Sequence, residues 1–171
     1  MNLVFKKCDR EDFEDFYILK CDEENIYWSG HRDKPNKDNL NRWYKEQLSR
    51  GDRIFFIIRS EGIIEPVGYL YLDIAGDGSN IIETGHGVNS IFKGKGIGTQ
   101  LIKYALEYTQ SNLKDIRIIE GWIMEDNIGS IKNVLKNGYK DTGENKWINV
   151  QGSQKEKKFK RYIYRIKDLE N

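Results

Sequence analysis

Residues 90–108, SIFKGKGIGTQLIKYALEY, place three glycines within five positions, directly before a helical pattern. Gly94, Gly96 and Gly98 would weaken a helix or strand that contained them, because glycine loses the most backbone entropy on folding. Backbone N–H groups at a helix N-terminus bind anions, and glycines let a phosphate approach them without meeting Cβ atoms. The stretch predicts either a phosphate-binding loop or a glycine-rich turn that only connects a strand to a helix.

Two common phosphate-binding motifs do not match this stretch. A P-loop needs a glycine five residues before the glycine of Gly-Lys-Ser/Thr, but Asn89 stands there and Gly96 replaces the Ser or Thr. A dinucleotide fingerprint needs GxGxxG in the first βαβ unit. Here the spacing is GxGxG, and the glycines lie more than halfway along the chain.

Strands and helices are mixed on both sides of the glycine stretch. Periodicity predicts helices at 9–24, 38–49 and 128–138, and another marked by Leu101 to Tyr108. The run at 53–59 is apolar at consecutive positions, so it is expected to be buried on both faces and to form an antiparallel hairpin with 67–74. No repeat or linker divides the chain, which predicts one domain, residues 1–171, with one mixed sheet and helices on its faces. The predicted strands are 3–8, 53–59, 67–74, 81–88, 116–123, 139–150 and 157–167.

Composition narrows the class of protein. The chain has 171 residues, with 28 basic and 27 acidic side chains, and this balance predicts no general attraction to nucleic acid or to an anionic membrane. No apolar run approaches the ~18 residues that span a bilayer. The N-terminus becomes charged within six residues, unlike a secretion signal. Cys8 and Cys21 are expected to be free thiols in a reducing cytoplasm, although they could pair in an oxidising compartment.

The segment VNSIFKGKGIGTQLI, residues 88–102, resembles the acetyl-CoA-binding motif of the GNAT N-acetyltransferase superfamily. That motif is a strand ending in Val, a turn, a bulky aromatic residue, and then Arg/Gln-x-x-Gly-x-Gly/Ala opening a helix. Val88 ends the strand here, and Phe92 is the aromatic residue. Lys93 stands where Arg or Gln is usual and keeps the positive charge of Arg.

A second segment, EDNIGSIKNVLKNGYKDTG at 125–143, resembles the motif that follows in the same family. That motif is Asn-x-x-Ala/Ser, followed by a short helix ending in Gly-Phe/Tyr. Asn127, Ser130, Gly138 and Tyr139 occupy its positions. Two motifs in register are far more specific than one glycine loop, so the chain is identified as a member of this superfamily.

The resemblance implies an α/β (α+β) GNAT fold, a single mixed and mostly antiparallel sheet of about seven strands with helices on both faces. The fourth and fifth strands would be parallel and splayed, with the pantetheine arm of acetyl-CoA between them. Backbone groups around Val88 and Ser90 would hold that arm and polarise the acetyl carbonyl. Asn127 would hydrogen-bond the arm, and no metal is expected. The loop and helix start would cradle the pyrophosphate through Lys93, Gly94, Lys95, Gly96, Ile97, Gly98 and Thr99.

Acetyl transfer needs an unprotonated amine, and the pKa of an alkyl amine is near ~10.4. Glu83 is the first candidate base, since relatives place a Glu at this point of the fourth strand; the alternative is a Glu in a surface ion pair. His86 is a second candidate, although strand alternation puts it on the other face and it could be a packed residue. Many relatives have a Tyr that protonates the leaving thiolate; Val134 occupies its position, so no general acid is assigned.

The acceptor site is the least defined part of the resemblance. Relatives build it from the first two helices, their loop and the last strands. Here the loop at 25–35 offers Trp28 and His31, and the C-terminal half offers Trp122 and Trp147. The acidic run between Glu11 and Glu24 could attract a cationic amine or could be a solvated helix face. YWSGHRDKP resembles the opening of aminoglycoside acetyltransferases, but Trp122 stands where some of those have an Asp base.

The expected function is direct acetyl transfer from acetyl-CoA to a primary amine, with a small-molecule acceptor preferred. A protein N-terminal acetyltransferase of the ribosomal-protein type, an aminoglycoside acetyltransferase and a non-catalytic acyl-CoA-binding regulator are the alternatives. Nucleic-acid binding through KKFKRYIYR, residues 157–165, is a further rival that strand alternation explains without a ligand. The sequence leaves open a monomer or a homodimer.

Overall fold

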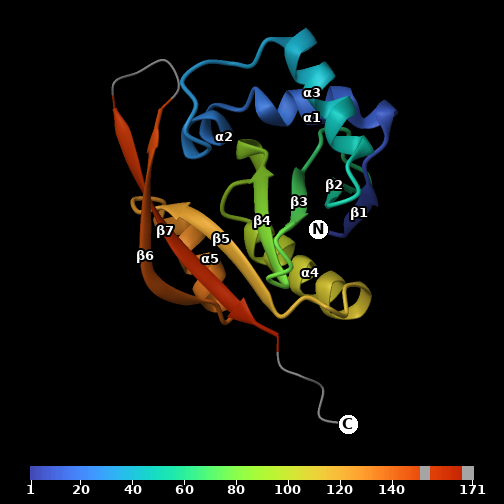
Figure 1. Cartoon of the computed structure of the whole chain (residues 1–171). Helices are drawn as coiled ribbons and strands as arrows, with labels where there is room; N and C mark the ends of the chain where they lie inside the picture. Colours follow the sequence, from blue (N-terminus) through green and yellow to red (C-terminus); the bar gives the residue numbers. More distant parts are fainter. Residues whose placement is uncertain (151–154, 167–171) are drawn as a thin grey trace.

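A seven-stranded sheet in the order β1-β2-β3-β4-β5-β7-β6 runs through the computed structural model, which describes residues 1–150 and 155–166 (Figure 1). Helices cover both faces of this sheet, as predicted. The strands are β1 (Leu3–Lys7), β2 (Arg53–Ser60), β3 (Gly68–Ile74), β4 (Ile81–Val88), β5 (Ile118–Met124), β6 (Lys140–Asn149) and β7 (Glu156–Arg165). The α-helices are α1 (Phe13–Lys20), α2 (Glu23–Trp28), α3 (Lys37–Ser49), α4 (Ile97–Asn112) and α5 (Ile128–Lys136), with 3-10 turns η1 (Arg10–Asp12) and η2 (Ser90–Phe92).

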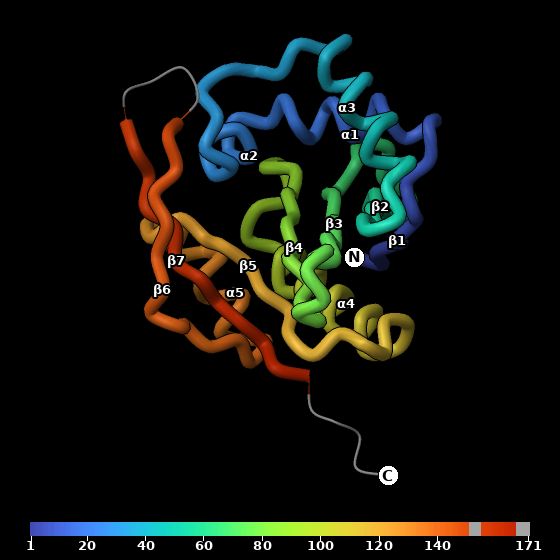
Figure 2. Tube along the Cα trace, viewed as in Figure 1, coloured from blue at the N-terminus to red at the C-terminus, as the bar shows by residue number. Residues whose placement is uncertain are grey.

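The strands β4 and β5 are parallel, and every other neighbouring pair is antiparallel. Their pairing covers three positions, from Ile81 opposite Ile118 to Glu83 opposite Glu120. Beyond these positions the two strands diverge, and Figure 2 shows the separation widening along β4. The predicted splay of the fourth and fifth strands is therefore confirmed.

Two clusters of buried side chains lie on opposite faces of the sheet. Strand β2 contributes to both, because Phe55, Phe56, Ile57 and Ile58 are all at most 5% exposed. This confirms the strand predicted to be buried on both faces. The α4 cluster includes Phe56, Leu70, Leu72, Ile82, Leu101, Ile119 and Val134. The α1–α3 cluster includes Phe13, Phe16, Leu19, Tyr44, Phe55 and Tyr69.

The helix predicted at 9–24 is confirmed as α1, but its bounds are wrong, because the segment also forms η1 and the start of a separate helix, α2. Asp22 has extended backbone angles, and its side chain accepts hydrogen bonds from the backbone N–H groups of Glu24 and Asn25. Aspartate satisfies helix-start donors in this way, so it favours a new helix over continuation of the old one. As a result Trp28 ends α2 and does not lie in a loop.

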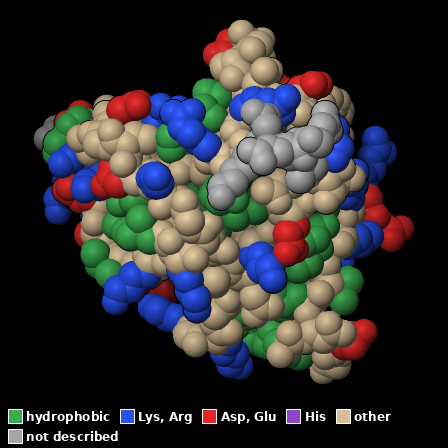
Figure 3. All heavy atoms as spheres, turned by 90° about the horizontal axis from the view of Figure 1, so that it is seen from below, with side chains coloured by type: hydrophobic (Ala, Val, Ile, Leu, Met, Phe, Trp, Pro, Cys, Tyr) green, Lys and Arg blue, Asp and Glu red, His purple; other side chains and the backbone are tan. Residues whose placement is uncertain are grey.

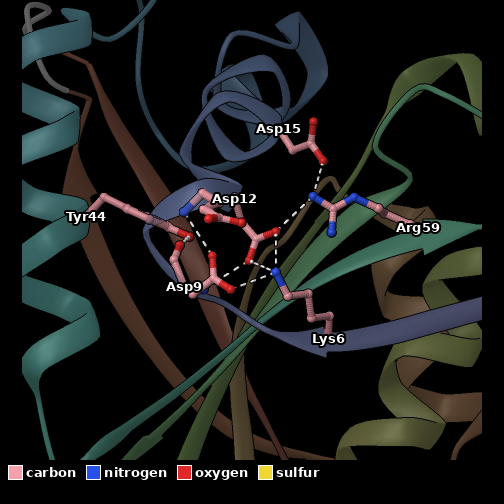
Figure 4. A network of polar contacts seen from close by, with 7 residues as sticks. Lys6, Asp9, Asp12, Asp15, Tyr44 and Arg59 are labelled. Carbon is pink, nitrogen blue, oxygen red and sulfur yellow. Dashed lines mark hydrogen bonds and ion pairs between the residues drawn. The ribbon is translucent and has the colours of Figure 1, made fainter.

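The acidic run between Glu11 and Glu24 is divided: Glu11, Glu14 and Glu23 are exposed, as on a solvated helix face, whereas Asp12 is buried. Asp12 is 1% exposed, and its carboxylate accepts hydrogen bonds from Lys6 at 3.0 Å and from Arg59 at 2.8 Å. Figure 4 shows both basic side chains pointing at Asp12, with Asp15 on the other side of Arg59. The hydroxyl of Tyr44 donates to the carbonyl of Asp9 at 2.8 Å. This network connects α1 and α3 to the sheet. Asp12 and Asp15 therefore contribute to the packing of these elements.

The surface has no simple charge pattern on the face seen in Figure 3, where basic and acidic side chains lie among hydrophobic patches. Within residues 1–150 and 155–166, no helix is long and apolar enough to cross a membrane. Cys8 and Cys21 are both free thiols, as expected. Gly138 follows α5 with φ of 85°, which confirms the predicted glycine at the end of that helix.

Candidate functional site

Backbone groups line the space between β4 and β5 where the strands diverge. The Ile81 carbonyl accepts from the Ala75 N–H, and the Asn89 N–H donates to the Val67 carbonyl, so both point toward β3. Because peptide groups alternate along a strand, those of His86 and Val88 point the other way, into the gap. The gap therefore has the donors and acceptors that an extended, amide-containing chain could bind.

Strand β5 contributes to the gap in the same manner. The Thr84 hydroxyl donates to the Glu120 carbonyl at 3.2 Å, which places that carbonyl on the side of β4. Alternation then places the peptide groups of Trp122, two residues on, on the same side. These groups have no strand partner among the described residues, because β4–β5 pairing stops at Glu120.

The N-terminus of α4 begins beside this gap. Gly94 and Gly96 have φ of 77° and 72°, and a Cβ on either would meet nothing within 4 Å. The N–H groups of Ile97 to Thr99 precede the first helical hydrogen bond, which runs from the Gln100 N–H to the Gly96 carbonyl. Open glycines at the positive end of a helix are compatible with anion binding, and binding of a pyrophosphate there stays a prediction.

The third glycine of the stretch serves helix packing. A Cβ on Gly98 would lie 2.6 Å from the Nδ2 atom of Asn133 on α5. The Thr99 hydroxyl donates to the Asn133 Oδ1 at 2.9 Å, and the Asn137 side chain donates to the Thr99 carbonyl at 3.3 Å. Gly98 thus permits α4 and α5 to touch, a role that glycine spacing alone did not reveal. Binding of pyrophosphate by Gly98 and Thr99 stays a prediction.

Asn127 is the N-cap of α5, and its Oδ1 atom accepts from the Ser130 N–H at 3.1 Å. The amide nitrogen of its side chain has no hydrogen bond among the described residues. The predicted hydrogen bond to a cofactor arm therefore stays a prediction, and it would use that nitrogen.

Helix α2 is attached to the end of β4 by contacts that the sequence analysis missed. The Asn25 side chain donates to the Val88 carbonyl at 3.2 Å, and the Ser90 N–H donates to Asp22 at 3.0 Å. Burial, which would raise the pKa of Asp22, is outweighed by hydrogen bonds led by those from Ser90, so the pKa is lowered. Asp22 and Ser90 are far apart in the sequence, so no local pattern could have predicted this contact.

The two lysines of the glycine loop are both exposed. Lys93 forms an ion pair with Glu24 of α2 at 2.5 Å, and the Lys95 ammonium lies 5.2 Å from the ring centre of Phe92. Exposed ion pairs of this kind contribute little stability. Either lysine can therefore turn to a phosphate group at low cost.

Glu83 occupies the sheet face covered by α1 to α3, between two other carboxylates. Asp73 is opposite it on β3 and Glu120 is opposite it on β5. Both neighbours have an arginine partner, Arg53 and Arg161, whereas no ion pair among the described residues includes Glu83. Burial is the main cause that raises the pKa of Glu83, with Lys146 opposing it and the two acids adding to it. Glu83 is not the ion-paired surface Glu of the alternative interpretation.

His86 lies on the opposite face from Glu83, as strand alternation predicted. Its Nε2 atom is 3.8 Å from a Cβ built on Gly98, so the ring lies under the start of α4. Burial lowers the pKa of His86 to about 4, which keeps the imidazole neutral near pH 7. Its side chain therefore faces the helix N-terminus, and a catalytic role for it stays a prediction.

Two tyrosines of β3 lie across two glycines of β4 on the Glu83 face. A Cβ on Gly85 would be 2.1 Å from the Tyr71 hydroxyl oxygen, and one on Gly87 would be 2.4 Å from the Tyr69 ring. Strand register pairs Tyr71 with Gly85 and Tyr69 with Gly87. The sequence could have suggested that β3 lies beside β4. It could not give the register that places each tyrosine opposite a glycine, because periodicity shows only which face a side chain occupies.

Three of the residues expected at the acceptor site lie in different surroundings. His31 lines a pocket of about 790 Å³ between α2, the segment after it and the β6–β7 hairpin. Trp28 packs against Tyr27 with ring centres 4.7 Å apart, and Trp122 packs under the Lys146 ammonium at 4.2 Å. Neither tryptophan lines that pocket. The structure therefore does not join all three residues into one wall. The other residues that line it are Glu23, Ile26, Tyr27, Arg32, Asp33, Lys34, Val150, Lys155 and Lys157.

Val134, at the position where many relatives have a Tyr, is 5% exposed and packs in the α4 cluster. Tyr139 is also buried, and burial raises its pKa. In the part of the chain that the structure describes, no three His, Cys, Asp or Glu side chains are grouped as metal ligands.

Comparison with known proteins gives one consistent result. The family described as "Acetyltransferase (GNAT) family" matches residues 11–139. An uncharacterized N-acetyltransferase from Methanocaldococcus jannaschii is 30% identical over 141 residues, which cover 79% of this chain and 58% of the relative. The chain thus matches little more than half the length of that relative.

Solved structures share the fold at low sequence identity. A Vibrio cholerae spermidine N-acetyltransferase, in complex with CoA and spermine, superposes with a TM-score of 0.83 at 15% identity, covering 96% of this chain and 95% of the other. The aminoglycoside acetyltransferase AAC(6')-Ib, in complex with coenzyme A, gives a TM-score of 0.75 at 16% identity with the same coverage.

Proposed function

The chain belongs to the GNAT family of acyltransferases, and on this premise we propose that it transfers an acetyl group from acetyl-CoA to the primary amine of a small molecule. One observation carries the proposal. The splayed end of β4 and β5 opens beside the N-terminus of α4, so an extended amide chain and a pyrophosphate could bind together.

Acetyl-CoA fits this arrangement through backbone groups. The pantetheine arm would hydrogen-bond the peptide groups of His86, Val88 and Trp122 in the manner of an added strand. The Val88 N–H would donate to the thioester oxygen and stabilise the negative charge that develops there. The pyrophosphate would meet Gly94, Gly96 and the first N–H groups of α4, with Lys93 released from Glu24 to add charge.

The acceptor would approach from the face that holds Glu83. The carboxylate of Glu83 would take a proton from the ammonium group, directly or through water, and the amine would attack the thioester carbon in a ternary complex. A thiol pKa near ~8.5 lets the thiolate leave with modest help, so no general acid is assigned.

A small-molecule amine remains the preferred acceptor. The Glu83 face combines aromatic rings and carboxylates, and both groups attract an alkylammonium ion. The relatives named for spermidine and for aminoglycosides act on small amines according to their names. Trp122 replaces the Asp base of some aminoglycoside enzymes, so an aminoglycoside is the weaker alternative. A protein N-terminus and a non-catalytic regulator are the others. We also propose a single domain, a cytoplasmic location and a monomer or homodimer.

A thiol-release assay tests the proposal. The full chain is incubated with acetyl-CoA and a panel of polyamines, amino acids, aminoglycosides and peptides, while free CoA thiol is measured and acetyl-CoA binding is followed by calorimetry. Thiol release with a small amine supports the proposal, and release with peptides alone supports the protein-acceptor alternative. Tight binding without thiol release from any amine would instead indicate the regulator.

A further inference from the structure

Lys146 of β6 extends over the indole of Trp122, with its ammonium 4.2 Å from the ring centre. Four basic side chains of the neighbouring strand β7 have a carboxylate partner: Lys157 pairs with Asp126, Lys158 with Glu125, Lys160 with Asp141, and Arg161 with Glu120 and Glu144. Lys146, by contrast, has no ion pair or hydrogen bond among the described residues, and it is only half-buried. Its ammonium is held by an aromatic face alone.

Trp122 places this ammonium at the mouth of the gap. Pairing of β5 with β4 ends at Glu120. Trp122 is the next residue of β5 whose peptide groups face β4. Its side chain is on the same face as Glu120, and Glu120 is beside Glu83. Across the gap on that face is Gly85 with the Tyr71 phenol over it. The charge of Lys146 also acts on the Glu83 carboxylate.

An alkylamine acceptor would need its ammonium held on an aromatic face and close to the candidate base. Lys146 presents a primary ammonium on the indole of Trp122, and its charge acts on Glu83. Strand β6 is at the edge of the sheet, and its pairing with β7 has a bulge between Asp141 and Asn145. Edge strands next to bulges move more easily than central strands. Lys146 belongs to neither buried cluster, so its side chain can change rotamer without displacing core residues.

We propose that Lys146 is an internal acceptor, which the enzyme acetylates when no external amine occupies the site. This inference rests on the proposed function. The Lys146 ammonium gives a proton to Glu83, and the Nζ lone pair attacks the thioester carbon of acetyl-CoA. The new C–N bond forms as the C–S bond breaks. CoA leaves as a thiolate and takes the second proton from the Lys146 nitrogen. The products are one acetyl-lysine, one CoA thiol and a protonated Glu83, which releases its proton to water.

Mass spectrometry of the whole chain, incubated with acetyl-CoA and no amine, tests this inference. We expect one added acetyl group, mapped by peptide analysis to Lys146, at a first-order rate that does not change when the protein is diluted. Lys146→Arg should abolish the modification. Lys158→Arg, a matched change on β7 in a lysine already paired with Glu125, should leave it intact. Gly96→Glu should reduce it to the level of exposed lysines such as Lys103.

Four results would overturn the inference, and they separate it from the proposed function. Thiol release with an external amine, together with an unmodified Lys146 after the incubation without amine, would leave the function standing and remove the internal acceptor. Absence of both acetyl-CoA binding and thiol release would remove both. Equal acetylation of Lys103, Lys132 and Lys146 would mean simple chemical acetylation. A rate that rises with protein concentration would mean that a second copy, not the same chain, performs the transfer.

Discussion

The phenol of Tyr71 lies across Gly85, and a Cβ on that glycine would fall 2.1 Å from the hydroxyl oxygen. The Arg53 guanidinium packs on the same ring at 4.7 Å from its centre. This stack brings an aromatic hydroxyl to the mouth of the β4–β5 gap, on the face that carries Glu83. The absence of a side chain at Gly85 is therefore part of how the site is shaped.

Gly85→Ala should lower the free energy of unfolding by about 1–3 kcal/mol, because the Tyr71 ring must move and its packing on Arg53 is lost. Urea denaturation measures this change. Gly76→Ala is the control, since a Cβ on Gly76 meets nothing within 4 Å. Equal stability of the two variants would show that Tyr71 can move away without cost.

Gly96→Glu should weaken acetyl-CoA binding at least about tenfold, or about 1.4 kcal/mol, because a carboxylate enters the predicted phosphate site. Gly62→Glu is a matched control: Gly62 has a similar φ of 74° and open space, but lies in the β2–β3 turn. Both substitutions place a Glu at a glycine of similar positive φ, so calorimetry with acetyl-CoA separates the effect of backbone strain from that of the charge at the loop. Wild-type affinity in a folded Gly96→Glu variant would contradict the loop assignment.

Glu83→Gln should reduce turnover by roughly 100-fold if Glu83 is the general base. The base is active as the carboxylate, and its pKa is raised, so the wild-type rate should increase with pH through a limb above the usual glutamate range. That limb should be absent in the variant. A pH–rate profile with the same acidic limb in both proteins would exclude Glu83 as the base.

The same substitution should increase stability at neutral pH. A raised pKa means that the fold favours the protonated carboxyl, whose contribution to stability is complete below the unfolded pKa and is lost as pH rises through the folded pKa. Gln is neutral at every pH, so it removes this loss. Urea denaturation at acidic and neutral pH should show the stabilising effect only at neutral pH.

Lys146→Gln should move the acidic limb of the pH–rate profile to higher pH, because the Lys146 charge lowers the pKa of Glu83. Lys158→Gln removes a neighbouring positive charge that pairs with Glu125, so its profile should match the wild type. A shift of the limb to lower pH in Lys146→Gln would mean that the two side chains do not interact as described.

Asp12→Asn should lower the free energy of unfolding by about 1–3 kcal/mol, because Lys6 and Arg59 lose the buried charge that both contact. Asp15→Asn also removes a partner of Arg59, but Asp15 is more exposed, so the loss should be under about 1 kcal/mol. Thermal or urea unfolding compares the two. Similar losses would indicate that burial of Asp12 adds nothing to this network.

The sequence by itself determined the family, the glycine loop and the order of nearly all strands and helices. These features are local: left-handed glycines before a helix, alternation in strands and a glycine after α5 are written in consecutive residues. One local reading failed at Asp22, where capping and continuation of a helix compete within the same few residues.

Only the tertiary structure decided which distant side chains meet. Asn25 reaches Val88, Tyr71 covers Gly85, Asn133 touches Gly98 and Lys146 reaches Trp122. Each pair joins two elements, so it depends on strand register, on helix docking and on the curve of the β6–β7 hairpin. Period-two and period-3.6 patterns show which face a side chain occupies, but they carry no information on its neighbour across the sheet. That is why the sequence could predict the glycine loop before α4 but not which side chains surround Glu83.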